Sequence, residues 1–204
     1  MTQAVHRQMR KSAEDFAYIV WPRIGPRVGG GKVIFSELVA ADGSLLSSQD
    51  IEAGVDAWQL LGNSMGMRGI ASRVQWCDKS YRTFTIRYRT RHGNQTEWQK
   101  RVMAISHDRD GILYPALTIQ AYMTGKVLLE AGAIRTKELF RFAFPMVRQA
   151  EKTQIFKPPL FQTNGADGNM FCVVRWVDLV RSAVDVVIVG ADMLFDEGDL
   201  GVTL

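Results

Sequence analysis

Two acidic residues in the N-terminal half are the first candidates for chemistry. Glu37 lies in the run KVIFSELVA and Asp56 lies in the run GVDAWQLL, and both runs have the composition of β-strands. A carboxylate inside an apolar strand is unfavourable unless a cation pairs with it. One interpretation therefore pairs Asp56 with Arg68 or Arg73 of the following predicted strand. The other makes Glu37 and Asp56 ligands of Mg²⁺ or Mn²⁺, because small divalent cations favour carboxylate oxygens.

A second candidate for chemistry is the basic segment from residue 68 to residue 101. It holds nine lysines and arginines against only two acids, Asp78 and Glu97, in a chain whose formal net charge is +4. Such a concentration of charge favours a polyanion, and arginine side chains bind phosphates without reading base sequence. The residues predicted to contact nucleic acid are Arg73, Arg82, Arg87, Arg89, Arg91, Lys100 and Arg101.

Aromatic residues are interleaved with these charges, at Trp58, Trp76, Tyr81 and Tyr88. Core packing is the expectation for most of them, and stacking on the bases of a single strand is the alternative. The intrahelical pair Glu97 and Lys100 is expected to be an ion pair on one helix face.

Other chemical motifs are missing. The run GPRVGGGK fails as a phosphate-binding loop, because Pro26 replaces the first glycine and Val33 replaces the Ser or Thr that would ligate magnesium. No serine lies in a G-x-S-x-G motif, and no His/Cys spacing indicates zinc. The two cysteines, Cys77 and Cys172, lie in strand-like runs and are expected to be free thiols, which fits a reducing, cytoplasmic location.

Periodicity indicates the elements that must position these residues. An amphipathic helix is predicted over residues 2–21, ending at Trp21-Pro22. Another helix begins at Thr96, with Gln99 completing a capping box, and a short one spans residues 136–142. Residues 178–190 are ambiguous between helix and strand. Strands are predicted over residues 32–40, 54–61, 68–76, 82–90, 113–123, 127–134 and 171–176.

This pattern predicts a single α/β or α+β domain over residues 1–190, with a mixed central sheet flanked by helices, followed by an acidic, frayed tail over residues 191–204. The clearest alternation lies in residues 82–90, where Phe84, Ile86 and Tyr88 share one face and Arg87 and Arg89 the other. No apolar run is long enough to span a membrane.

The order of these elements resembles the PD-(D/E)XK nuclease superfamily over roughly residues 1–145, which implies a restriction-endonuclease-like fold. Asp56 matches the aspartate of that family and Glu37 its glutamate, so the resemblance implies a metal site on these two residues. The second half of the motif, an acid, any residue and a lysine, would fall on the strand of residues 68–76. That strand offers no acid, and Arg73 or Gln75 stands where the lysine belongs.

The predicted function is therefore nucleic-acid binding, to DNA rather than RNA, by a nuclease-like domain with an atypical or inactive metal site. Such a protein is expected to work within a larger DNA-processing assembly, with protein partners or further copies of itself. Two alternatives stay open. One is an active endonuclease that uses Mg²⁺ or Mn²⁺, with Glu37, Asp56 and Arg73 or Gln75 as catalytic residues. The other is a protein-interaction subunit whose basic face meets an acidic partner.

Overall fold

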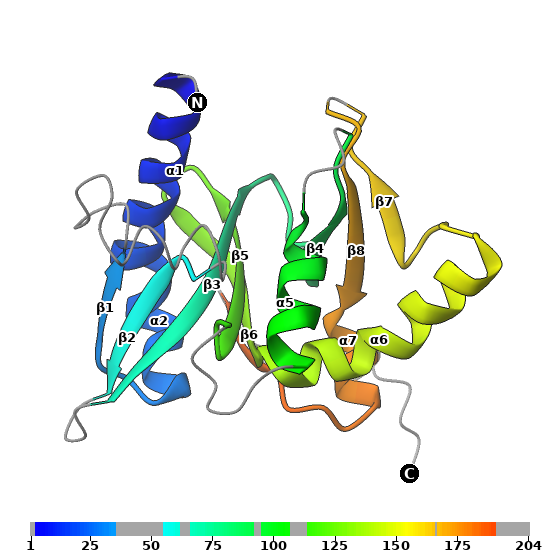
Figure 1. The fold of residues 1–204 in the computed structure, drawn as a ribbon. Coiled ribbons are helices and arrows are strands. Elements are labelled where there is room, and N and C mark those ends of the chain that lie inside the picture. The colour runs from blue at the N-terminus through cyan, green and yellow to red at the C-terminus, as the bar shows by residue number, and fades with distance from the viewer. Residues whose placement is uncertain are drawn as a thin grey trace, which may run out of the picture.

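The computed structural model of the chain describes residues 3–35, 55–61, 66–91, 95–106, 114–165 and 167–190. It confirms a single mixed α/β domain, in which the strands form two sheets rather than one (Figure 1). The larger sheet contains, in spatial order, β1 (Lys32–Phe35), β2 (Ala57–Leu61), β3 (Gly66–Trp76), β5 (Leu117–Thr124), β6 (Val127–Arg135) and β9 (Val187–Gly190). The smaller sheet contains β4 (Thr83–Arg89), β8 (Met170–Arg175) and β7 (Phe161–Thr163).

The connection between β3 and β5 positions most of the candidate site. These two strands pair in parallel, whereas every other described strand pair is antiparallel. Parallel neighbours need a long crossover, and this one carries β4 and the helix α5 (Glu97–Ser106). As a result α5 contacts β4, and both lie beside the middle of the larger sheet (Figure 1).

The N-terminal helix runs further than the sequence predicts. α1 (Gln3–Asp15) continues through a π-helical turn, η1 (Phe16–Val20), into α2 (Trp21–Ile24) and a 3₁₀ turn, η2 (Gly25–Val28). The prediction that the helix ends at Trp21-Pro22 is wrong. Pro22 occupies the first turn of α2, directly after a π-helical turn in which the backbone N–H of Trp21 bonds to the carbonyl of Phe16, five residues back.

Two hydrophobic clusters lie on opposite faces of the larger sheet. The first joins the N-terminal helices to the sheet and includes Phe16, Ile119 and Met123. The second fills the space between the two sheets and packs under α6 (Thr136–Thr153) and α7 (Trp176–Arg181). β5 contributes to both clusters because successive side chains of a strand point to opposite faces: Ile119 and Met123 lie in the first, and Tyr122 lies in the second.

Several predicted boundaries change in the C-terminal half. α6 extends well past residue 142, and the ambiguous segment from residue 178 to residue 190 contains the end of α7 and then β9. Cys77 and Cys172 are free thiols, as predicted. Glu37, the second half of the first predicted strand and the acidic tail lie outside the described residues. Within the described part of the chain, no helix has the length and apolarity needed to cross a membrane.

Candidate nucleic-acid interface

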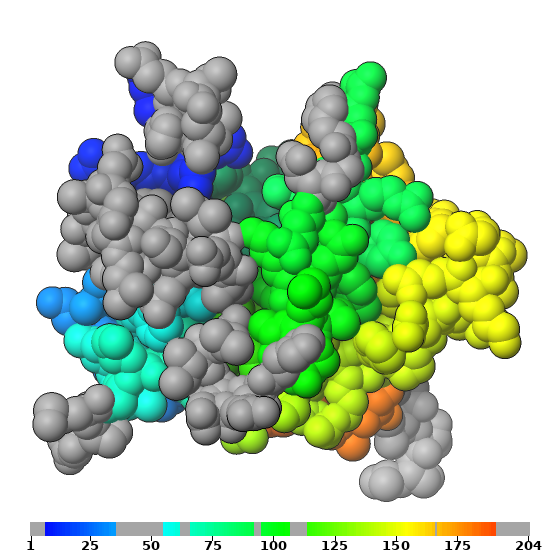
Figure 2. Space-filling view, viewed as in Figure 1, coloured from blue at the N-terminus to red at the C-terminus, as the bar shows by residue number. Residues whose placement is uncertain are grey.

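A cleft of about 490 Å³ opens where β3, β4, β5 and α5 meet, and Met9 of α1 and Asp56, which directly precedes β2, also line it. α5 occupies the centre of the molecular face shown in Figure 2. We call this site the basic cleft. Its charged lining residues are Asp56, Arg73, Arg87, Glu97, Lys100 and Arg101. The described part of the lining thus holds four cations and two carboxylates, an excess of positive charge.

Glu97, at the start of α5, holds the arginines of the cleft together. Its Oε2 atom accepts hydrogen bonds from Arg73 Nη2 at 3.1 Å and from the backbone N–H of Arg87 at 3.1 Å, while its Oε1 atom lies 2.7 Å from Arg101 Nη2. Burial alone would raise the pKa of Glu97, but Arg101, Arg73 and the N–H of Arg87 together hold that pKa below its usual value. The carboxylate is therefore ionised at neutral pH and serves as a counterion.

Arg101 is buried at the base of this network. Its side chain is only 3% exposed. Its Nε and Nη1 atoms have no hydrogen-bond partner among the described residues. A buried guanidinium is strongly unfavourable unless anions compensate it. Glu97 is shared with Arg73, so one carboxylate serves two guanidinium groups. Glu97 is therefore the shared counterion of Arg73 and Arg101.

Asp56 lines the basic cleft next to β3. Its Oδ2 atom accepts a hydrogen bond from the backbone N–H of Ser72 at 2.6 Å. Arg68 donates to the side chain of Gln59 and to the Val28 carbonyl, and Arg73 donates to Thr85 and Glu97.

The predicted metal pair of Glu37 and Asp56 stays a prediction, since Glu37 lies outside the described residues. Among those residues, no group of three or more His, Cys, Asp or Glu side chains is arranged to hold a metal ion.

The polar wall of the cleft includes a residue that the sequence interpretation missed. Gln120 of β5 is buried, its Oε1 accepts the backbone N–H of Thr85 at 2.8 Å, and its Nε2 donates to Gln75 Oε1 at 2.8 Å. Gln75 therefore contacts an amide rather than a charged group. The signal for Gln120 was present in the sequence, because Thr118, Gln120 and Tyr122 alternate with apolar residues along β5.

The structure separates the seven predicted nucleic-acid-binding residues. Arg73, Arg87, Lys100 and Arg101 line the cleft together. Arg82 does not line the cleft and makes a bidentate ion pair with Glu130, in which the shortest N–O distance is 2.8 Å. The guanidinium of Arg89 lies 4.9 Å from the ring centre of Phe156. Arg91 lies against Gly168, between β7 and β8.

Core packing is confirmed for two of the four interleaved aromatic residues. Trp58 and Tyr88 are buried. Trp76 is half-buried and donates its Nε1 hydrogen to Asp15, whereas Tyr81 is exposed. None of the four lines the basic cleft.

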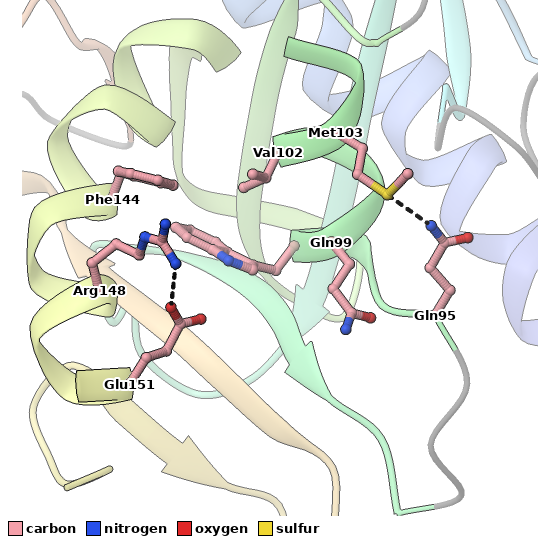
Figure 3. A pocket seen from close by; sticks show the side chains of 8 residues that line it. Gln95, Gln99, Val102, Met103, Phe144, Arg148 and Glu151 are labelled. Carbon is pink, nitrogen blue, oxygen red and sulfur yellow. Dashed lines mark hydrogen bonds and ion pairs between the residues drawn. The ribbon is translucent and has the colours of Figure 1, made fainter. Parts of the chain in front are cut away.

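A second hollow, of about 510 Å³, lies between α5 and α6 and differs in chemistry. Figure 3 shows Val102 of α5 and Phe144 of α6 facing each other across it. At its edge Arg148 Nη1 pairs with Glu151 Oε2 at 3.5 Å. The cation in the lining of this hollow is Arg148, which is already paired with Glu151. The basic cleft, in which four cations lie together, is therefore the better candidate for an anionic ligand.

Comparison of the chain with models of known protein families, with curated proteins and with solved structures finds no match. Its function therefore has to be inferred from the geometry and charge of the site itself.

Proposed function

We propose that the chain binds nucleic acid through the basic cleft. The observation that carries this proposal is the convergence of Arg73, Arg87, Lys100 and Arg101, from three separate elements, onto one cleft whose described lining holds four cations and two carboxylates. Phosphate groups of a nucleic-acid strand would balance this positive charge, and arginine suits them because its planar fork binds phosphate oxygens in pairs.

The fixed geometry of the arginines supports the same proposal. Arg73 is held by Thr85 and Glu97, with Nη1 2.8 Å from Thr85 Oγ1. Arg101 is held by Glu97. Side chains that are already ordered lose little entropy on binding a ligand. The side chain of Arg87 is exposed, so a polyanion can reach this cation of the cleft from solvent.

The test removes cleft charges and compares the result with an equal loss of charge elsewhere. The variant Arg87→Gln/Lys100→Gln should bind a labelled 20-residue oligonucleotide more weakly than the wild type. Its plot of log affinity against log salt should be less steep by about one for each phosphate that the variant no longer neutralises. The matched control is Arg141→Gln/Arg148→Gln on α6, where both arginines are about 70% exposed and outside the cleft. Fluorescence anisotropy at several salt concentrations measures both quantities.

Two results would overturn the proposal. The first is the absence of salt-sensitive binding by the wild-type protein, which would favour an acidic protein partner for the same face. The second is an equal loss of affinity in the cleft variant and in the α6 control, since that would reflect the net charge of the protein rather than this site.

Metal-dependent cleavage of the bound strand is a second candidate, favoured by the place of Asp56 in the same cleft. The order α1, β1, β2, β3, β4 and α5 is also the order on which the resemblance to PD-(D/E)XK nucleases rests. This candidate expects plasmid DNA to be cut with Mg²⁺ or Mn²⁺, to stay intact with a chelator, and to stay intact with Asp56→Asn. If the protein binds DNA but does not cut it with either metal ion, the cleavage function is excluded and only the binding function stands.

A further inference from the structure

Phe171, on β8, is an aromatic side chain on the face of the smaller sheet that also carries Arg87, and two arginines of the basic cleft lie against it. It lies directly opposite Arg87 in the antiparallel pairing of β4 with β8. The guanidinium carbon of Arg73 lies 5.4 Å from the centre of its ring, and that of Arg87 lies 6.0 Å away. Two cations of the cleft are therefore gathered around one half-buried ring.

Phe84, Ile86 and Cys172 of the smaller sheet belong to the second hydrophobic cluster. Phe171 does not belong to it and lies on the opposite face, as does the buried Val173. Opposed residues of an antiparallel pair share a face, so Phe171 shares this face with Arg87 on one side and with Gln162 of β7 on the other. Both of these neighbours are exposed.

We infer that Phe171 is a stacking platform for a nucleobase, and that the preferred ligand of the basic cleft is single-stranded nucleic acid. This inference rests on the proposed function and narrows it to one class of ligand. Bases of a duplex are already stacked on their neighbours, whereas a base of a single strand is free to lie on an aromatic ring. Arg73 and Arg87 would then hold the phosphates on either side of that base, since both guanidinium groups lie next to the ring.

Stacking and phosphate binding leave different signatures, so they can be separated. Phosphate contacts set the salt dependence of binding, while stacking on an aromatic ring depends little on salt or base identity. Replacing Phe171 should therefore lower the affinity for single strands at every salt concentration and leave the slope of the salt plot unchanged. Replacing Arg87 should change the slope.

The variants are Phe171→Leu, which removes the aromatic ring, and Phe171→Trp, which keeps one. The matched control is Phe144→Leu, because Phe144 also lies under an arginine, with the guanidinium carbon of Arg148 5.3 Å from its ring, but outside the cleft. Each protein is titrated with single-stranded DNA, single-stranded RNA and duplex DNA of equal length. Phe171→Leu should weaken single-strand binding about fivefold or more, while Phe171→Trp and Phe144→Leu stay close to the wild type.

A measurement on the wild type covers the case in which Phe171→Leu folds poorly. An oligonucleotide carrying 4-thiouracil or 5-bromouracil, irradiated in complex with the protein, should become cross-linked to Phe171 within the peptide of β8. Cross-links found only at other sites would contradict the inference.

The two levels of the proposal fail in different ways. Equal affinity of the wild type for single strands and duplex, with no effect of Phe171→Leu, overturns the stacking site and leaves nucleic-acid binding in place. No salt-sensitive binding to any of the three ligands overturns the proposed function and this inference with it. If the protein binds single strands of DNA but not of RNA, or of RNA but not of DNA, the result supports the stacking platform. It also shows whether the ligand contains deoxyribose or ribose.

Discussion

At the level of single residues, Glu97 is the side chain on which the basic cleft depends. It accepts from Arg73 and from the backbone N–H of Arg87, and it pairs with the buried Arg101. Glu97 thus forms an intrahelical ion pair with Arg101, four residues further along α5. The low pKa of Glu97, which these cations impose against the effect of burial, excludes it as a proton donor at neutral pH.

Glu97→Gln should lower the free energy of unfolding by about 3 kcal/mol at pH 7, because it leaves the buried charge of Arg101 without its acid. The pKa of Glu97 is lower in the folded protein than its ordinary value of 4.5. Its ionised form therefore stabilises the fold above that value, and this stabilisation disappears as the pH falls through the folded pKa. Urea unfolding measures the free energy of unfolding of wild type and variant at pH 7 and at pH 3.5. The difference between the two proteins should be smaller at pH 3.5, and a difference that does not change with pH would contradict this role of Glu97.

Residue types in the sequence were enough to nominate most charged members of the cleft. Asp56, Arg73, Arg87, Lys100 and Arg101 were all predicted to take part in the site, and all five line one cleft. Thr85, Gln120 and Phe171 were missed because their importance comes from contacts between segments far apart in the sequence. A phenylalanine in a strand is normally a core residue, and only the pairing with β4 shows which face Phe171 occupies.

At the level of elements, the start of α5 determines where Glu97, Lys100 and Arg101 are placed. The predicted capping box is confirmed: Gln99 Oε1 accepts the backbone N–H of Thr96 at 2.9 Å, and Thr96 Oγ1 accepts the backbone N–H of Gln99 at 3.3 Å. This reciprocal pair satisfies amide groups that the helix itself leaves unbonded. It also fixes the residue at which the helix begins.

Thr96→Ala should lower the free energy of unfolding by about 1 kcal/mol, the usual effect of losing an N-cap hydroxyl. Thr96→Ser keeps the hydroxyl and serves as the control. Chemical denaturation followed by far-ultraviolet circular dichroism measures both variants. If Thr96→Ser were as unstable as Thr96→Ala, the methyl group of this buried threonine, rather than its hydroxyl, would be the important part.

Local patterns predicted the existence of elements better than their ends. The alternation in residues 82–90 identified β4 and its buried face correctly, since Phe84, Ile86 and Tyr88 are buried and Arg87 and Arg89 are exposed. The helix boundary at Pro22 was wrong, because a proline is as compatible with the first turn of a new helical segment as with the end of an old one.

At the level of the whole molecule, a row of polar contacts joins the two sheets. The hydroxyl of Tyr122 on β5 lies 2.7 Å from Thr83 Oγ1 and donates to the Thr83 carbonyl at 2.9 Å. The side chain of Gln120 also donates to that hydroxyl at 2.9 Å and accepts from the backbone N–H of Thr85. β4 is thus attached to β5 by side chains, although the two strands belong to different sheets.

Tyr122→Phe should lower the free energy of unfolding by about 2 kcal/mol, because it leaves buried polar groups of Thr83 and Gln120 without a partner. Hydrogen exchange should also be faster at the amide of Thr83, which donates to the Tyr122 hydroxyl at 3.2 Å, than at amides within β6. Exchange that rises equally in β4 and β6 would mean that the hydroxyl supports the core in general rather than the junction of the sheets.

The division into two sheets could not be predicted from the sequence. The pairing of β4 with β8 depends on segments from opposite halves of the chain, and their local patterns fit equally well into one continuous sheet. The general class, α/β with a mixed sheet, follows from the alternation of helices and strands along the chain and is confirmed.

The pairing of β4 with β8 also sets the order in which the protein can acquire its site during synthesis. β4 is synthesised long before β8, so this pairing cannot form until α6 and β7 have also been made. A chain that stops before Met170 has the arginines of β3, β4 and α5 but lacks Phe171 and the strand that supports this wall of the cleft. Unfinished chains would therefore lack part of the wall beside the cleft.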